Sequence, residues 1–301
     1  IIETKEDTIG ELNWLGQIKA EKWMFRQTFI DESVYHYLSL PFDCRVADIC
    51  VNIPAERWVY GTDWLIREYD GAIRAEKGPL KGAWTHLSPD SVLRKGVAYL
   101  IGVSEDVVLE FSAISETHKE IPVSVKSYPA TLPVNAGWNF VPTGLWTSFN
   151  GNAVLSNGEL LNYVYLSNDH MRTFTAYEVS EVTLAPFAGF FVQIPEDITE
   201  INFEQEVKLS APKFLASQES GKVKITLQHT DLGSDATTLI IDDAETTDYR
   251  INHDLHKMTD SEGRRPQIYS LGADTKLAYN ALPTLAAKDV MLGCTVSQNG
   301  I

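Results

Sequence analysis

Residues 185–203 read APFAGFFVQIPEDITEINF, and residues 94–111 read RKGVAYLIGVSEDVVLEF. Each stretch is an apolar run followed by a Glu-Asp pair and by a second strand-like run that ends in phenylalanine, at Phe203 and at Phe111. Their spacing of about 90 residues is longer than the repeats of solenoid proteins. The pattern therefore predicts two related β modules in one chain.

Strand-like patterns continue through the rest of the chain. β-branched and aromatic residues cluster in short runs bounded by Gly, Pro, Asn or Asp, which is typical of strands. Strands are expected at residues 34–40, 63–69, 97–103, 107–111, 122–128, 162–167, 173–179, 189–194, 222–228, 237–242, 267–271, 276–280 and 290–296. These runs predict an all-β fold.

Helical patterns are rare in this sequence. Residues 8–23 predict one short N-terminal helix, in which Thr8 and Glu11 have the spacing of a capping box. Residues 88–93 and 254–258 suit single helical turns. Helices are therefore expected to contribute little to the fold.

The repeat divides the chain into four segments. These are an N-terminal segment at 1–30, a first antiparallel β module at 31–118, a second at 119–208 and a C-terminal β-sandwich at 209–301.

The end of the chain carries a turn signal. Residues 290–296 read as a strand, and Asn299-Gly300 follows with the dipeptide that favours type I′ hairpin turns. Only Ile301 lies after this turn, and the chain begins IIETKED without a methionine. We therefore expect a fragment of a longer protein, whose C-terminal sandwich is incomplete and whose last strand has an open edge.

Charge and hydropathy exclude two classes of partner. The formal net charge is −16, from 41 acidic and 25 basic residues, and such a charge repels phosphate backbones and anionic lipid surfaces. No apolar run approaches the length of a membrane-spanning helix. We therefore expect neither nucleic-acid binding nor direct membrane insertion.

The three cysteines are too few for a disulfide scaffold. Buried free thiols are the default expectation for Cys44, Cys50 and Cys294. A bridge between Cys44 and Cys50 remains an alternative if the stretch between them bends, because a straight strand holds residues six positions apart too far from each other.

Aromatic and charged side chains crowd one part of the first module. The candidate ligand-binding residues are Trp58, Tyr60, Trp64, Arg67, Tyr69, Arg74 and Trp84. Rings flanked by charged hydrogen-bonding groups suit carbohydrate, since sugar C–H faces pack on rings and hydroxyls take polar partners. In the alternative interpretation some of these rings belong to the core, and Arg74 is a buried structural partner of Glu68 or Asp70.

Catalytic signatures are missing from the sequence. It contains no phosphate-binding glycine loop, nucleophile elbow or HExxH motif, so we predict no catalytic residues and no cofactor. The acidic stretch 231–248 offers weak calcium candidates, Asp231, Asp235, Asp242 and Asp243. The alternative is that these are ordinary solvated turn residues.

Several short motifs, in order along the chain, carry a family resemblance. They lie at residues 38–49, 64–75, 137–141, 186–193, 254–258 and 268–283. Through them the chain resembles β-rich regions of large secreted or cell-surface proteins of Bacteroidetes. The resemblance implies an extracytoplasmic location and an attachment or interaction role.

These observations lead to three functional hypotheses. The first is a non-enzymatic module of a secreted or cell-surface protein, with an adhesin, spacer or interaction role and an extracellular glycan or protein as partner. The second is a carbohydrate-binding accessory region that uses the aromatic patch of the first module. The third is a hydrolase with an unrecognised site, for which the sequence offers no convergent pair of carboxylates and no Ser/His pair.

Overall fold

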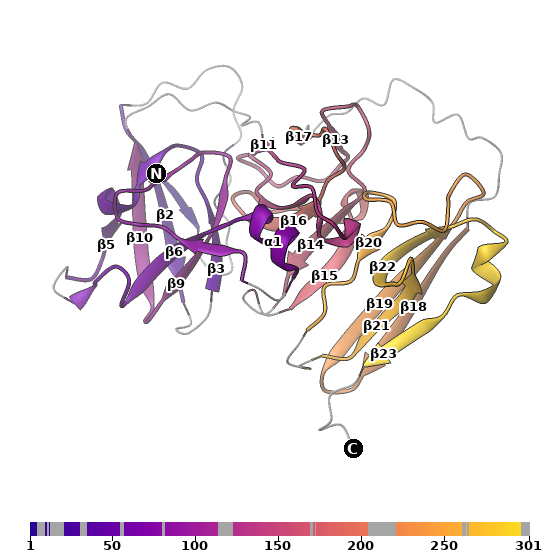
Figure 1. Ribbon diagram of the computed structural model, residues 1–301. Helices are drawn as coiled ribbons and strands as arrows, with labels where there is room; N and C mark the ends of the chain where they lie inside the picture. Colours follow the sequence, from indigo (N-terminus) through magenta and orange to yellow (C-terminus); the bar gives the residue numbers. More distant parts are fainter. Residues whose placement is uncertain are drawn as a thin grey trace.

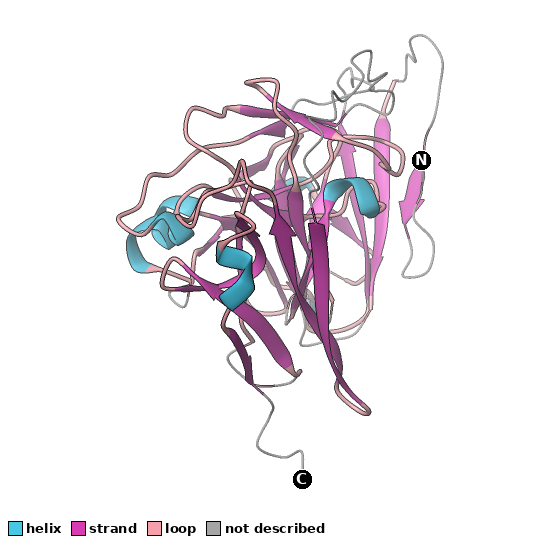
Figure 2. Ribbon diagram, turned by 90° about the vertical axis from the view of Figure 1, so that its right-hand side faces the viewer, coloured by secondary structure: helices cyan, strands magenta, loops and turns pink. Residues whose placement is uncertain are grey.

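The computed structural model confirms the all-β class (Figure 1, Figure 2). It describes residues 1–4, 10, 12, 21–30, 35–54, 57–79, 82–113, 123–168, 171, 173–203, 221–260, 263 and 265–295. Three β units follow one another in chain order, from violet through salmon to yellow in Figure 1.

The first unit is a sandwich of two four-stranded sheets. One sheet has the order β1 (Ile2–Thr4), β2 (Trp23–Phe29), β10 (Val107–Ala113) and β5 (Cys50–Val51). The other has the order β3 (Tyr35–Ser39), β9 (Ala98–Val103), β6 (Trp64–Tyr69) and β7 (Trp84–His86), and a small pair is formed by β4 (Cys44–Arg45) and β8 (Val92–Leu93). Side chains from both large sheets, such as Phe111 and Ile101, share one buried core.

The second unit is also a two-sheet sandwich. One sheet has the order β11 (Val123–Ser124), β17 (Glu200–Phe203) and β13 (Ala153–Leu155). The other has the order β12 (Trp138–Val141), β16 (Phe190–Gln193), β14 (Tyr163–Ser167) and β15 (Phe174–Glu178). Its core lies between the sheets and contains Phe203 and Val192.

The sequence repeat corresponds to a repeat of topology. The order β3-β9-β6-β7 in the first unit matches β12-β16-β14-β15 in the second, and β2-β10-β5 matches β11-β17-β13. In each copy the Glu-Asp turn takes the chain from one sheet to the facing sheet, so the two strands around it do not pair. The sequence therefore predicted two related modules correctly.

Residues 221–295 form the third unit, a single mixed sheet. Its strands are β18 (Gly221–His229), β19 (Gly233–Ile241), β22 (Thr275–Leu282), β21 (Gln267–Gly272) and β23 (Leu292–Thr295), with β20 (Leu255–His256) paired to β22. β19 and β22 run parallel. Within the part of the chain that is described, this one sheet stands in place of the two packed sheets expected of a β-sandwich. β23 lies at its edge, and Asn299-Gly300 is outside the described residues.

Several local expectations were wrong. Trp23–Phe29 is strand β2 and pairs with β10, so the boundary after residue 30 cuts through the first unit. Most of the helix expected at 8–23 lies outside the described residues, as do the boundaries near residues 118 and 208. Residues 88–91 form a turn closed by the Ser91 N–H on the Ser88 carbonyl at 3.0 Å, followed by strand β8, whereas 254–258 contains the short strand β20 instead of a helical turn.

The sequence analysis missed helix α1 (Gly71–Lys77). Asp70 caps it by accepting a hydrogen bond from the backbone N–H of Ala72 at 2.9 Å, as Asp does at many helix starts. Short 3-10 turns are η1 (Val46–Asp48), η3 (Pro133–Asn135), η4 (Val179–Glu181) and η5 (Ala286–Asp289). No helix in the described ranges has the length and apolarity needed to cross a bilayer.

The cysteines are free thiols. Cys44 is buried, whereas Cys50 and Cys294 are exposed. The stretch between Cys44 and Cys50 does bend, through η1, but no bridge forms.

A third buried cluster joins the units to one another. β9, β12 and β16 bury both of their faces: one face packs on the unit's own core, and the other meets neighbouring units. The members of this junction cluster are Ala98 and Leu100 of the first unit, Trp138, Phe140, Tyr163, Tyr165 and Phe191 of the second, and Leu255, Ala278 and Tyr279 of the third. Strands buried on both faces read as continuous apolar runs, which explains why these segments dominate the sequence repeat.

Candidate functional site

The structure separates the seven predicted ligand-binding residues into two groups. Trp58 and Trp64 are buried in the first unit's core, with 5% and 8% of their surfaces exposed, and their rings stack at 6.4 Å. Tyr60 packs edge-on against Trp64 and donates its hydroxyl to the carbonyl of Leu87 at 2.8 Å. These three rings are structural, which agrees with the alternative interpretation that part of the set belongs to the core.

The other four residues line one cavity at the junction of the three units. Arg67, Tyr69, Arg74 and Trp84 contribute its first wall. The second unit adds Met171, Phe174 and Phe191, and the third adds His256, Lys257, Met258 and Thr259. The cavity has a volume of about 350 Å³, which is within the range of small-molecule sites.

Arg74 is a deeply buried charge in this cavity. Helix α1 carries it into the junction, where only 7% of its surface is exposed. Its guanidinium lies 4.2 Å from the ring centre of Trp138, in cation–π geometry. Its Nε and Nη2 are buried and have no hydrogen-bond partner among the described residues. It therefore is not the predicted partner of Glu68 or Asp70, because Asp70 caps the helix instead.

Burial lowers the pKa of Arg74, although nearby tyrosines oppose this effect. A guanidinium remains protonated in proteins even so. Buried donors without partners are uncommon, because each loses its bonds to water. Arg74 is thus a buried positive charge with free donors at the wall of a cavity.

Tyr69 and Trp84 form the aromatic side of the cavity. Their rings meet edge to face at 5.2 Å, and Tyr69 also packs against Phe191 of the second unit at 5.0 Å. The Tyr69 hydroxyl is buried and makes no hydrogen bond of standard geometry in the described part of the chain, and the Arg74 side chain lies within reach of it. Burial raises its pKa to about 12, against the attraction of Arg74, so it remains a neutral donor at physiological pH.

Arg67 and His256 bring further polar atoms to the same walls. The Arg67 guanidinium lies 4.8 Å from the ring centre of Tyr35, and its Nε is buried with no partner among the residues described. The Nδ1 atom of His256 is likewise buried and has no hydrogen-bond partner among the residues described. Burial, together with the charges of Arg74 and Lys276, lowers the pKa of His256 to about 4, so this ring is neutral near pH 7.

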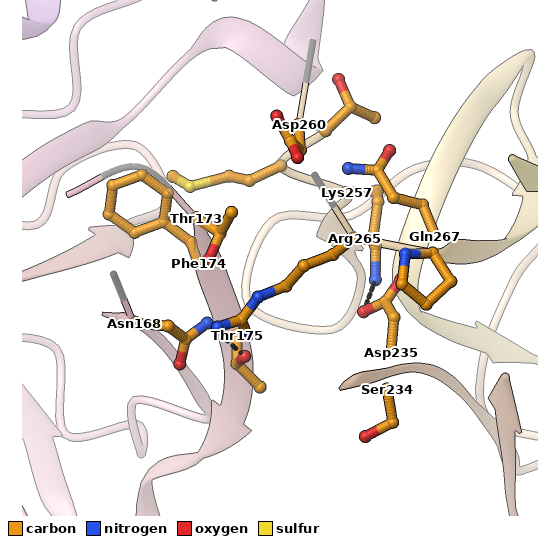
Figure 3. A pocket seen from close by; sticks show the side chains of 13 residues that line it. Asn168, Thr173, Phe174, Thr175, Ser234, Asp235, Lys257, Asp260, Arg265 and Gln267 are labelled. Carbon is orange, nitrogen blue, oxygen red and sulfur yellow. Dashed lines mark hydrogen bonds and ion pairs between the residues drawn. The ribbon is translucent and has the colours of Figure 1, made fainter. Parts of the chain in front are cut away.

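Lys257 carries a charge that is already neutralised. Its Nζ donates to a carboxylate oxygen of Asp235 at 2.6 Å and to the carbonyl of Ala236 at 3.1 Å (Figure 3). Asp235 also accepts a hydrogen bond from the backbone N–H of Ile268. This pair lines a smaller neighbouring cavity of about 90 Å³, where Arg265 extends toward Asn168 and Thr175 (Figure 3).

The sign of charge in the junction cavity differs from that of the whole chain. None of the described residues that line it is acidic, whereas Arg67 and Arg74 both face it without an ion-pair partner in the described structure. The chain as a whole has a net charge of −16. The cavity therefore favours an anionic group over a cationic one.

The calcium candidates do not form one site. Asp231 and Asp235 lie near one end of the β18–β19 hairpin, and Asp242 and Asp243 lie beyond the other end of β19. Asp242 accepts from the N–H of Ala244 and Asp243 from that of Thr284. Within the described ranges no group of three or more His, Cys, Asp or Glu side chains could hold a metal ion.

The cavity residues outside the first module were not predicted from the sequence. Phe174, His256 and Met258 reach the cavity from strands or loops far apart in the sequence. The motif at 254–258 marked the region of His256, but no local pattern indicates that this loop lies against Arg74.

Comparisons with known proteins do not assign a family to the chain. No model of a protein family matches it. Searches among curated proteins and among solved structures found no significant match either.

Proposed function

We propose that the chain is a rigid, non-enzymatic interaction module of a secreted or cell-surface protein. The observation that supports this proposal is the junction cluster, which joins all three units through buried aromatic contacts. An adhesin or spacer needs such stiffness, because it must hold a binding surface at a fixed distance and angle. The order of short motifs that resembles secreted and cell-surface proteins supports the extracytoplasmic location.

Contacts between the first two units are part of the first unit's own core. Phe187 of the second unit lies 4.9 Å from Phe25, and Trp146 lies 5.3 Å from Trp23. Both second-unit rings belong to the buried core of the first sandwich. Separating the units would expose this core, so the two sandwiches are expected to move together.

The third unit is tied to the second by rings and hydrogen bonds. Tyr163 and Tyr279 stack at 4.3 Å. Asn162 donates two hydrogen bonds to Asn252, one from its backbone N–H and one from its side-chain amide. The side-chain amide of Asn252 in turn donates to the carbonyl of Leu160. Lys222 adds ion pairs to Glu178 and Glu181. These contacts combine apolar burial with satisfied polar groups, which is how stable interfaces are built.

Small-angle X-ray scattering of the chain in solution tests the rigidity on which this role depends. The curve calculated from the three docked units should fit the data with one conformation. A curve that requires an ensemble of differently oriented units would contradict the proposal.

Antibodies against the chain test the location. Intact cells of the producing organism, or their culture medium, should carry the antigen, whereas labelling only after lysis would contradict the extracytoplasmic assignment.

A second candidate function is carbohydrate binding in the junction cavity. It is favoured by one observation: Arg67, Tyr69, Arg74 and Trp84, four of the predicted ligand-binding residues, line the same cavity. Glycan-array binding should then be lost in Trp84→Ala and retained in Tyr37→Ala, which removes an exposed ring elsewhere in the first unit. Binding that survives in Trp84→Ala would exclude this cavity as the glycan site.

A further inference from the structure

We infer that the junction cavity binds a small carboxylate carried on an apolar ring. This inference shares with the second candidate above only the premise that the cavity binds a small ligand, and it names a different ligand class from carbohydrate. Three features of the cavity support it: the unpartnered cations, the apolar walls, and the neutral donors beside them.

The first step concerns Arg74 and Arg67. Arg74 is more than nine-tenths buried, its Nε and Nη2 have no partner among the described residues, and no acidic residue of those described lines the cavity. A buried charge is costly unless a counter-charge accompanies it. A carboxylate supplies both the charge and the acceptor atoms that a guanidinium binds best.

The second step concerns the walls. Most of the lining is apolar or aromatic, with Trp84, Leu100, Phe174 and Phe191 contributing side chains from two units. Such walls favour the burial of an apolar ring, while the polar groups beside them are donors suited to its carboxylate. The ring should therefore be apolar rather than polyhydroxylated.

The third step concerns the donors that accompany the arginines. The Tyr69 hydroxyl is buried beside Arg74 and makes no hydrogen bond of standard geometry within the described structure, and the Nδ1 of the neutral His256 ring has no partner there. A carboxylate has about four acceptor positions, so it can use the tyrosine as well as an arginine. A neutral amide has only one acceptor oxygen, where a carboxylate has two, and it carries no charge.

Isothermal titration calorimetry with a matched pair of probes tests the inference. Indole-3-acetate should bind saturably. Indole-3-acetamide, which has the same ring without the charge, should bind at least about tenfold more weakly, since charge-assisted hydrogen bonds are roughly twice as strong as neutral ones. Glucuronate and glucose serve as a second pair that replaces the apolar ring by a sugar.

Variants assign the binding to the cavity. Arg67→Gln and Arg74→Lys should each weaken the binding of indole-3-acetate by about tenfold or more. Arg45→Gln is the matched control, because Arg45 is exposed, lies outside the cavity and pairs with Asp48 at 2.7 Å; its affinity should equal that of the parent. Circular dichroism checks that each variant is folded. If Arg74→Lys does not fold, the result for Arg67→Gln decides the test.

Four results would overturn the inference. Three of them are equal binding of the acid and the amide, unchanged affinity in folded Arg67→Gln, and no saturable binding of either carboxylate at millimolar concentration. Binding of glucose without binding of indole-3-acetate would also overturn it, while leaving the carbohydrate candidate standing. Failure of the carboxylate site and failure of the ligand-binding role are thus distinguishable.

Discussion

Two tryptophans of the first unit, Trp64 and Trp84, make different kinds of contact although they are close in sequence. Trp64 is the first residue of β6 and faces the core, whereas Trp84, on β7, lies at the junction beside Phe140 and Phe191. Alternation along β6 places Trp64 and Ile66 on the core side and Tyr69 on the other. The sequence thus indicated that part of the aromatic set is core, but it did not show which residues meet other units.

Replacement of Trp64 by Ala should destabilise the first unit strongly. Loss of a buried tryptophan costs about 3–5 kcal/mol of unfolding free energy, because apolar contacts are lost and a cavity remains. Chemical denaturation measures this value. Tyr37→Ala is the control and should change stability by far less, since Tyr37 is partly exposed; equal losses in the two variants would contradict the core assignment.

His256 should make the protein sensitive to acid. Burial, with the charges of Arg74 and Lys276, lowers its pKa from 6.5 to about 4, so the unfolded chain takes up a proton at this residue before the folded chain does. Stability is therefore lost as the pH falls from about 6.5 to about 4, by up to about 3 kcal/mol.

His256→Gln isolates this contribution. The parent's advantage over the variant in unfolding free energy should be larger at pH 7 than at pH 4.5, because the variant lacks the group that titrates. Urea denaturation at both pH values measures the difference, and other acidic groups, including Asp254, cancel in it. A difference that is independent of pH would show that His256 is not kept neutral by the fold.

At the scale of elements, helix α1 docks the first unit on the second. A Cβ atom at Gly71 would meet the backbone carbonyl oxygen of Trp138 and the ring of Tyr128. Gly71→Ala should therefore destabilise the protein by about 1–3 kcal/mol through overpacking, despite the higher helix propensity of Ala. Thermal unfolding measures the effect. Glu76→Ala, on the exposed part of the same helix, is the control; stabilisation by Gly71→Ala would contradict this docking.

Strand patterns predicted most of the elements because period-two alternation and β-branched runs are local signals. The runs at 97–103, 189–194 and 276–280 were found in this way and correspond to β9, β16 and β22. The short helix α1 was missed because seven residues hold too few turns to show a period. Pairing between distant segments, such as β2 with β10, leaves no local pattern either.

The candidate site was only partly predictable for the same reason. Arg67, Tyr69, Arg74 and Trp84 stood out because they cluster within twenty residues of one another. Phe191 and His256 complete the cavity only after three units have docked. Docking depends on the complementary shapes of strands that are buried on both faces. The residue types of such a strand indicate that it is buried, but they do not show which unit packs against it.

At the scale of the whole molecule, the junction cluster should couple the stabilities of the units. Tyr279 stacks on Tyr163 and belongs to the cluster that also contains Trp138. Tyr279→Ala should destabilise the chain by about 3–5 kcal/mol and should lower the midpoint for all units together. Tryptophan fluorescence reports the first two units, because the third has no tryptophan; an unchanged fluorescence midpoint in this variant would argue against coupling.

The central claim is that three β units form one rigid body around the junction cluster. Differential scanning calorimetry of the intact chain tests it most directly. One rigid body predicts a single transition whose calorimetric and van't Hoff enthalpies agree, since that equality is the mark of cooperative two-state unfolding. Two or more resolved transitions, with the third unit melting independently of the first two, would contradict the claim.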